Sequence, residues 1–110
     1  MRNCFRCRIR IGRVRLEMVE LRDLRAFEML ATELHFGRAA VRLGVSQPTL
    51  SRYVRRLEQE LGVVLADRTS RTVRLTYAGH ELATALPVAL RQLERTLAAT
   101  RAVAEGGWEI

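Results

Sequence analysis

Apolar residues recur at steps of three and four in the first half of the chain, the spacing that places them on one face of a helix. The first such stretch covers residues 21–34, where charged side chains occupy many of the intervening positions. Its apolar face is formed by Leu21, Leu24, Phe27, Leu30, Ala31 and Leu34. We therefore expect an amphipathic helix over residues 21–34, followed by an interruption at Gly37.

The next stretch has the order of a short helix, a turn and a second helix. Residues 38–43 form the short helix, and their two consecutive alanines allow another helix to approach closely. Gly44 supplies the positive φ angle of a tight turn. Ser46 is a preferred N-cap, and the proline two residues later falls in the first helical turn, where a missing N–H costs nothing. This order predicts a helix-turn-helix whose second helix covers residues 47–61.

The second helix is expected to have two chemically different faces. Its apolar stripe consists of Leu50, Val54, Leu57 and Leu61. At about 100° per residue, the opposite face carries Pro48, Arg52, Arg55 and Gln59, flanked by Thr49, Ser51 and Arg56. Such a polar, cationic face suits a helix that enters the major groove of DNA. The alternative is an ordinary solvated helix face, which the preceding turn and cap disfavour.

A hairpin is expected after the second helix. The β-branched run at residues 63–65 and the alternating residues 72–75 predict two short strands around a polar turn at residues 67–71. Arg68, Arg71 and Arg74 lie at or near the tip, and narrow minor grooves attract such arginines. The alternative is that these arginines only aid solubility.

A long final helix is predicted from Tyr77 to about Glu105, with Thr76 as its cap and Pro87 inside it. Four leucines repeat at steps of four, three and four, like a heptad seam, at Leu86, Leu90, Leu93 and Leu97. Since a domain of about 60 residues is small, we expect it to leave this stripe uncovered. The seam therefore predicts pairing with a second chain.

Charge supports a nucleic-acid partner only in part. The chain has 110 residues, enough for one small domain with an extension, and a formal net charge of +7. All 19 basic residues are arginine, which suits phosphates and guanine edges but also results from GC-rich coding. Residues 1–17 contain six arginines and one glutamate, so most of the excess charge belongs to this segment.

The N-terminal segment has several interpretations that the sequence leaves open. It is expected to be disordered or to result from a wrongly assigned start of translation, and the alternatives are a basic arm along DNA phosphates or a strand without a partner. Its Cys4-x-x-Cys7 pair lacks the two further ligands of a zinc site. We therefore expect two incidental thiols and no metal.

Other function classes find little support. The sequence has no phosphate-binding loop, no supported Ser-His-Asp or Cys-His arrangement and no cluster of metal ligands, so we expect neither an enzyme nor a cofactor. No apolar run is long enough to span a membrane. The lack of a disulfide framework fits the cytoplasm.

Four stretches of the sequence resemble the N-terminal DNA-binding domain of LysR-type transcriptional regulators. They are ELRDLRAF, FGRAAVRLGVSQPTLSRYVRRLEQELGVVL, DRTSR and VRLTYAG, which begin at residues 20, 36, 67 and 73. The string S-Q-P-x-L-S-R followed by R-x-L-E-x-E-L-G is specific to this family. The sequence departs from the family pattern at Tyr53, Ala66 and Tyr77.

This resemblance implies a mainly α fold, a winged helix-turn-helix of three helices plus a two-stranded β wing, followed by a long linker or dimerisation helix. The implied organisation is a basic extension over residues 1–17, a DNA-binding domain over 18–76, a linker helix over 77–105 and a C-terminal stub over 106–110. The implied partners are double-stranded DNA, read as an interrupted dyad, and a second copy of the chain.

The resemblance also implies roles for individual residues. The side chains implied to touch base edges are Gln47, Pro48, Ser51 and Arg52. Those implied to lie near the DNA backbone or at the wing are Arg38, Thr49, Arg55, Arg56, Arg68, Thr69 and Arg71. Dimerisation is implied for Leu86, Leu90, Leu93 and Leu97.

Members of this family carry a C-terminal effector-binding domain that the sequence does not contain. We therefore expect an excised fragment or a truncated product, and no small-molecule effector for this chain. An alternative function is a truncated interaction module that forms heterodimers with full-length relatives through the linker helix.

Overall fold

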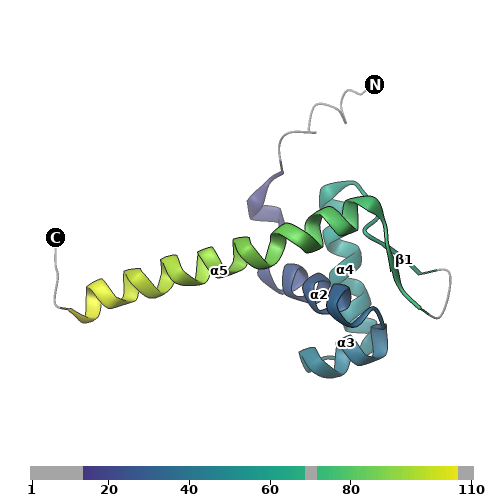
Figure 1. The fold of residues 1–110 in the computed structure, drawn as a ribbon, viewed down its shortest axis with the longest axis horizontal. Helices are drawn as coiled ribbons and strands as arrows, with labels where there is room; N and C mark the ends of the chain where they lie inside the picture. The colour runs from purple at the N-terminus through teal and green to yellow at the C-terminus, as the bar shows by residue number, and fades with distance from the viewer. Residues whose placement is uncertain (1–13, 69–71, 107–110) are drawn as a thin grey trace.

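The computed structural model describes residues 14–68 and 72–106. A 3-10 turn, η2 (Leu16–Met18), precedes three helices, α2 (Leu21–Glu33), α3 (Phe36–Leu43) and α4 (Gln47–Leu61). A hairpin of β1 (Ala66–Asp67) and β2 (Arg74–Leu75) follows, and then the long helix α5 (Tyr77–Glu105). Three helices form the body, the hairpin stands at one side, and α5 extends far beyond the body (Figure 1). This architecture confirms the expected winged helix-turn-helix with a long final helix.

The core lies where α2, α3 and α4 meet. Phe27 and Leu30 from α2 and Leu50 and Val54 from α4 are all fully buried. The two alanines of α3 are also buried, and their small side chains allow that helix to pack closely. The central parts of the predicted apolar stripes therefore face one another, whereas Leu21 and Leu34, at the ends of the first stripe, are 49% and 40% exposed. No helix among the described residues is long and apolar enough to cross a membrane.

The turn between α3 and α4 has the predicted chemistry. Gly44 has a φ of 82° and donates its N–H to the carbonyl oxygen of Ala40 at 2.9 Å. The Ser46 hydroxyl then accepts the Thr49 N–H at 3.2 Å and caps α4. These local bonds fix the start of the second helix of the motif.

The expected interruption at Gly37 was wrong. The chain turns at Leu34, which has a φ of 53°, and α3 begins at Phe36, so Gly37 lies in its first turn. The cap of α3 is His35, whose Nδ1 accepts the Arg38 N–H at 3.0 Å. A residue with an acceptor side chain, rather than a glycine, marks this helix boundary.

The expected position of the first strand was also wrong. The strands pair antiparallel with Ala66 opposite Leu75 and Asp67 opposite Arg74, whereas Val63 and Val64 lie outside the sheet and are 40% and 59% exposed. After α4 ends at Leu61, Gly62 takes a φ of 73° and changes the direction of the chain. The β-branched run forms the connection to β1, and pairing starts three residues later.

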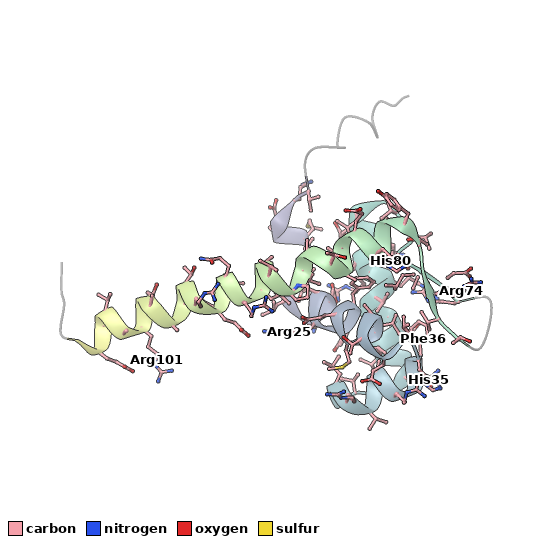
Figure 2. The ribbon with its side chains drawn as sticks, viewed as in Figure 1. Arg25, His35, Phe36, Arg74, His80 and Arg101 are labelled. Atoms are coloured by element: carbon pink, nitrogen blue, oxygen red, sulfur yellow. The ribbon has the colours of Figure 1, made fainter. Side chains whose placement is uncertain are left out.

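Helix α5 begins as predicted and continues through Pro87. The Thr76 hydroxyl accepts the Gly79 N–H at 3.0 Å and donates to the Val64 carbonyl at 2.6 Å, which ties the start of α5 to the segment before β1. Farther along, Arg25 of α2, which is labelled in Figure 2, places its Nη2 2.7 Å from Glu94 Oε2 of α5. These two polar contacts tie α5 to other parts of the fold.

The expectation that the body leaves the whole leucine seam uncovered was wrong for its first half. Leu86 and Leu90 are each only 5% exposed, because they pack into the core of their own chain. Leu93 and Leu97 lie beyond the body and are 45% and 60% exposed. Only the second half of the seam is free to meet another chain.

Candidate nucleic-acid interface

Helix α4 separates its apolar and polar faces as its sequence pattern predicts. Leu50 and Val54 have no exposed surface, whereas Gln47, Arg52 and Arg55 are exposed. The core contacts of the leucine and valine thereby fix the rotation of the helix. Its polar N-terminal face is directed away from the core as a consequence.

The N-terminal end of α4 borders a hollow of about 500 Å³. Its lining consists of Gln47, Pro48 and Ser51 of α4 together with Phe36 and Arg68. The Gln47 amide, which can donate and accept hydrogen bonds, thus shares one concave surface with the Ser51 hydroxyl and the rings of Pro48 and Phe36. This combination can bind a partner through both hydrogen bonds and apolar contact.

Arg52 and Arg55 are the most available cations of α4. The Arg52 guanidinium makes one long contact, 3.4 Å to the Thr49 hydroxyl, which in turn accepts the Ser46 hydroxyl at 2.9 Å. Arg55 forms no ion pair with any residue that the structure describes. Both guanidinium groups are therefore free to meet an anion.

The charge of α3 is partly neutralised within the chain. Arg38 Nε lies 3.6 Å from one carboxylate oxygen of Glu33, and Arg42 Nη1 lies 2.7 Å from the other. The Arg38 side chain is still 62% exposed. Arg38 can exchange Glu33 for an anion of a binding partner at a small cost in free energy, since exposed ion pairs contribute little to stability.

The Arg56 guanidinium is engaged within its own chain, and the expectation that it lies near phosphates stays a prediction. Its guanidinium contacts α2, with Nη2 3.4 Å from Glu20 Oε2 and Nε 3.7 Å from Asp23 Oδ2. Asp23 is only 1% exposed, and burial raises the pKa of its carboxyl group despite the opposing effect of Arg56. Arg56 therefore joins the two helices.

Arg68 is likewise held by the protein rather than exposed at a wing tip. Its Nη2 lies 3.1 Å from Glu58 Oε1, and its guanidinium carbon lies 5.5 Å from the centre of the Phe36 ring. Only 24% of its side chain is exposed. Thr69 and Arg71, the other expected wing contacts, lie outside the described residues.

Sequence reasoning missed the central role of Glu58. Its carboxylate is nearly buried and accepts the backbone N–H groups of Leu65 and Ala66 at 2.8 and 3.2 Å, in addition to Arg68. It therefore ties the first strand of the wing to α4. Its position one residue after Leu57, beside the apolar stripe, was the signal available in the sequence.

Comparison with known proteins agrees with this architecture. Residues 21–80 match the family described as bacterial regulatory helix-turn-helix protein, lysR family. The uncharacterized regulator YnfL of Escherichia coli is 56% identical over 63 residues, which are 57% of this chain and 21% of YnfL. The regulator AlsR of Bacillus subtilis is 43% identical over 88 residues, 80% of this chain and 29% of AlsR. The chain thus spans less than a third of either relative.

Solved structures with the same fold include DNA complexes of other proteins. The BenM DNA-binding domain bound to catB site 1 DNA has a TM-score of 0.74 and 37% identity, covering 82% of this chain and 97% of that chain. The CbnR DNA-binding domain bound to DNA has a TM-score of 0.73 and 39% identity, covering 77% of this chain and 98% of that chain. Since the family match also spans more than half of the residues, the chain belongs to the LysR family of bacterial helix-turn-helix regulators.

Proposed function

We propose that the chain binds double-stranded DNA sequence-specifically, as the DNA-binding part of a LysR-type transcriptional regulator. The observation that carries this proposal is the exposed polar face of α4, held outward by the burial of Leu50 and Val54 on the opposite face. A helix of this form enters the major groove by its N-terminal end. The similar BenM and CbnR domains form complexes with DNA, which supports DNA as the partner of this chain.

The side chains divide into two kinds of contact. Gln47, Ser51 and Arg52 read base edges by hydrogen bonds, and Pro48 adds an apolar contact beside them. Arg38, Thr49 and Arg55 bind phosphates and so supply affinity and its dependence on salt. Thr69 and Arg71 complete the grip at the wing.

Arg56 and Arg68 are assigned indirect roles. Because their guanidinium groups are engaged by acids of the same chain, they hold α4 and the wing in position for the direct contacts. Their removal should alter DNA binding through the placement of these elements.

The chain acts as a homodimer through the second half of the α5 seam. Leu93 and Leu97 are the exposed leucines of this helix, and a second copy would cover them. Two copies related in this way would read an interrupted dyad. Such a regulator works in the bacterial cytoplasm, at the nucleoid, and catalyses no reaction.

Selection from a random pool of DNA duplexes tests this function. The protein should enrich an interrupted dyad at both low and moderate salt, and the Arg52→Ala variant should relax the preference at one position in each half-site. Recovery of duplexes without a shared motif, at both salt concentrations, would refute sequence-specific binding.

A further inference from the structure

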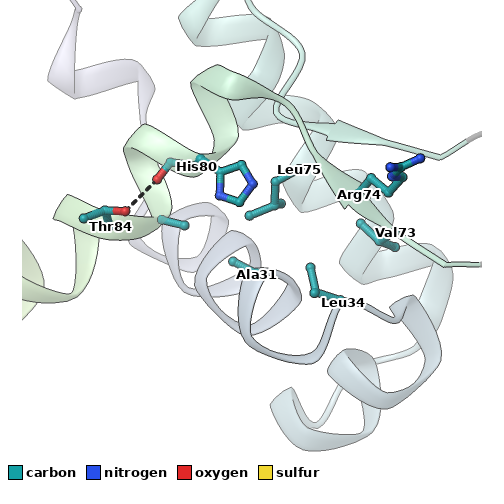
Figure 3. Close-up of a pocket in the computed structure, with 8 residues that line it drawn as sticks. Ala31, Leu34, Val73, Arg74, Leu75, His80 and Thr84 are labelled. Atoms are coloured by element: carbon teal, nitrogen blue, oxygen red, sulfur yellow. Dashed lines mark hydrogen bonds between the residues drawn. The ribbon is translucent and has the colours of Figure 1, made fainter.

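Helices α2 and α5 run antiparallel, and the first turns of α5 pack loosely against the end of α2. Ala31 of α2 and His80 and Ala83 of α5 line a hollow of about 490 Å³ between the two helices and β2 (Figure 3). The two alanines are too small to fill this space. The first turns of α5 therefore do not by themselves fix the direction in which the rest of the helix points.

The packing of α5 against the core ends at Leu90. Leu86 and Leu90 are each 5% exposed, whereas every residue of α5 from Arg91 onward is exposed. Pro87 lies between the two leucines and has no N–H to donate to the carbonyl of Ala83, so the helix bends most easily at this point. The part of α5 beyond Leu90 would change direction readily if nothing else held it.

An ion pair with α2 reaches α5 beyond this point. Arg25 Nη2 lies 2.7 Å from Glu94 Oε2, and Arg25 Nη1 lies 3.7 Å from Glu28 Oε1 on its own helix. Because a guanidinium is a rigid planar group, contact with two carboxylates orients it toward Glu94. Figure 2 shows Arg25 where α5 leaves the body. Among the residues that the structure describes, Glu94 makes the polar contact to another element that lies farthest along α5.

We propose that the Arg25–Glu94 pair sets the spacing between the two half-sites that the dimer reads. This inference rests on the proposed function, because it presupposes a dimer joined through Leu93 and Leu97 on an interrupted dyad. Glu94 lies between these leucines in the sequence, so the pair connects the body that reads DNA to the part of α5 that joins the copies. Arg25 and Glu94 are thus positioning residues, which act through the placement of α4.

A small change in the bend of α5 is enough to change this spacing. The helix from Pro87 to Leu97 is about 15 Å long at a rise of about 1.5 Å per residue, so a change of about 10° at Pro87 would move Leu97 by about 2.6 Å relative to the body. Since a twofold axis relates the two copies, the distance between their bodies would change by up to twice this amount. That change exceeds the rise of about 3.4 Å between successive base pairs.

The alternative is an ordinary surface ion pair without a specific role. An exposed pair changes an equilibrium constant by up to about fivefold, which is too little to decide whether the chain folds, because Leu86 and Leu90 already attach α5 to the core. The same factor is enough to favour one direction of α5 over another, and it acts once in each copy. The pair should therefore affect spacing rather than the affinity for a single half-site.

The test uses duplexes that carry the two half-sites of the selected dyad at the selected spacing, or with one or two base pairs added or removed. A further duplex carries a single half-site. Fluorescence anisotropy measures the affinity for each duplex. The wild type should bind the selected spacing at least tenfold more tightly than a spacing changed by two base pairs. Glu94→Gln should reduce this preference at least threefold and leave the affinity for the single half-site unchanged.

Exchange of the two charges gives a readout that a merely structural role would not move. Glu94→Arg alone should also reduce the spacing preference, and its combination with Arg25→Glu should restore it. The matched control is Glu105→Gln, which breaks the exposed pair of Arg101 Nε with Glu105 Oε2 at 3.0 Å within α5 and should keep the wild-type preference. Circular dichroism and analytical ultracentrifugation establish whether each variant is folded and dimeric.

Several results would overturn the inference while leaving the proposed function intact. They are a wild type that binds its dyad equally well at every spacing, a Glu94→Gln variant with undiminished preference, and no recovery in the double exchange. Dissociation of the Glu94→Gln dimer would assign the pair to the dimer contact instead. Failure of the wild type to bind any dyad or half-site would refute the proposed function, and this inference with it.

Discussion

The guanidinium of Arg68 lies 3.1 Å from the carboxylate of Glu58, so an ion pair connects the wing to α4. The same carboxylate accepts the backbone N–H groups of Leu65 and Ala66. One nearly buried acid of α4 therefore sets where the wing begins. The placement of the wing relative to α4 depends on a contact between residues ten positions apart.

Glu58→Ala should destabilise the protein by about 2–4 kcal/mol, because it leaves two backbone donors and Arg68 without their acceptor. Urea denaturation measures the change. The control is Glu60→Ala on an exposed position of the same helix, which should change stability by about 0.5 kcal/mol or less. Equal effects of the two substitutions would contradict the role of Glu58 as the wing tether.

Arg52→Ala should cost about 1–3 kcal/mol of binding free energy on a selected duplex, since a base contact is lost. On random duplexes the loss should be much smaller. Fluorescence anisotropy with both duplexes makes the comparison. An equal loss of binding free energy on both duplexes would show that Arg52 contacts a phosphate and not a base.

Arg55→Ala should weaken selected and random duplexes by a similar factor, because a phosphate contact carries no sequence information. It should also reduce the slope of log affinity against log salt by about 1. A salt titration of both duplexes measures this. An effect confined to the selected site would show that Arg55 reads a base.

Asp23 should make folding stability depend on pH in an unusual direction. Burial raises the pKa of its carboxyl group in the folded protein above the reference value of 3.8. The folded state therefore binds the proton more readily than the unfolded state does. The contribution of Asp23 to the free energy of unfolding is therefore largest at low pH. It is lost as the pH rises from the reference pKa of about 3.8 through the raised pKa of the folded state.

Asp23→Asn removes this titration. The stability of the variant relative to the wild type should therefore increase between pH 4 and pH 7, as the wild-type carboxyl group ionises within the fold. Urea denaturation across this range tests the sign, with Glu81→Gln at an exposed position as the control. A relative stability that stays constant or falls with pH would contradict the assignment.

The two halves of the leucine seam should respond differently to substitution. Leu97→Arg, at the exposed end of the seam, should abolish the rise of the melting temperature with protein concentration that dimerisation produces. Leu86→Ala, in the core, should lower stability by about 2–5 kcal/mol at every concentration. Differential scanning calorimetry over a hundredfold range separates the two. If the melting temperature of the Leu97→Arg variant still rose with protein concentration, this part of α5 would not belong to the dimer interface.

The sequence predicted those features that depend on neighbouring residues. Gly44 and Ser46 fix a turn and a cap through bonds within a few residues, and the spacing of Leu50 and Val54 determines which face of α4 is buried. The bounds of α4 and α5 followed from such local signals.

Features that depend on contacts between distant residues could not be predicted in this way. Periodicity places Arg56 at the flank of the polar face, but only the packing of α2 brings Asp23 and Glu20 to its guanidinium. The position of β1 is set by a carboxylate of α4, and the burial of Leu86 and Leu90 depends on how far the body extends along α5. These are tertiary relationships that one segment of sequence does not contain.

Disulfide trapping shows whether the N-terminal face of α4 lies in the major groove. The protein carries Ser51→Cys in a background of Cys4→Ser and Cys7→Ser, and the selected duplex carries a thiol tethered to a base in the major groove. We expect rapid trapping at this position, and none for Thr96→Cys on α5. Equal trapping at both positions, or trapping of the Ser51→Cys protein only through a tether in the minor groove, would contradict the placement of α4 in the major groove.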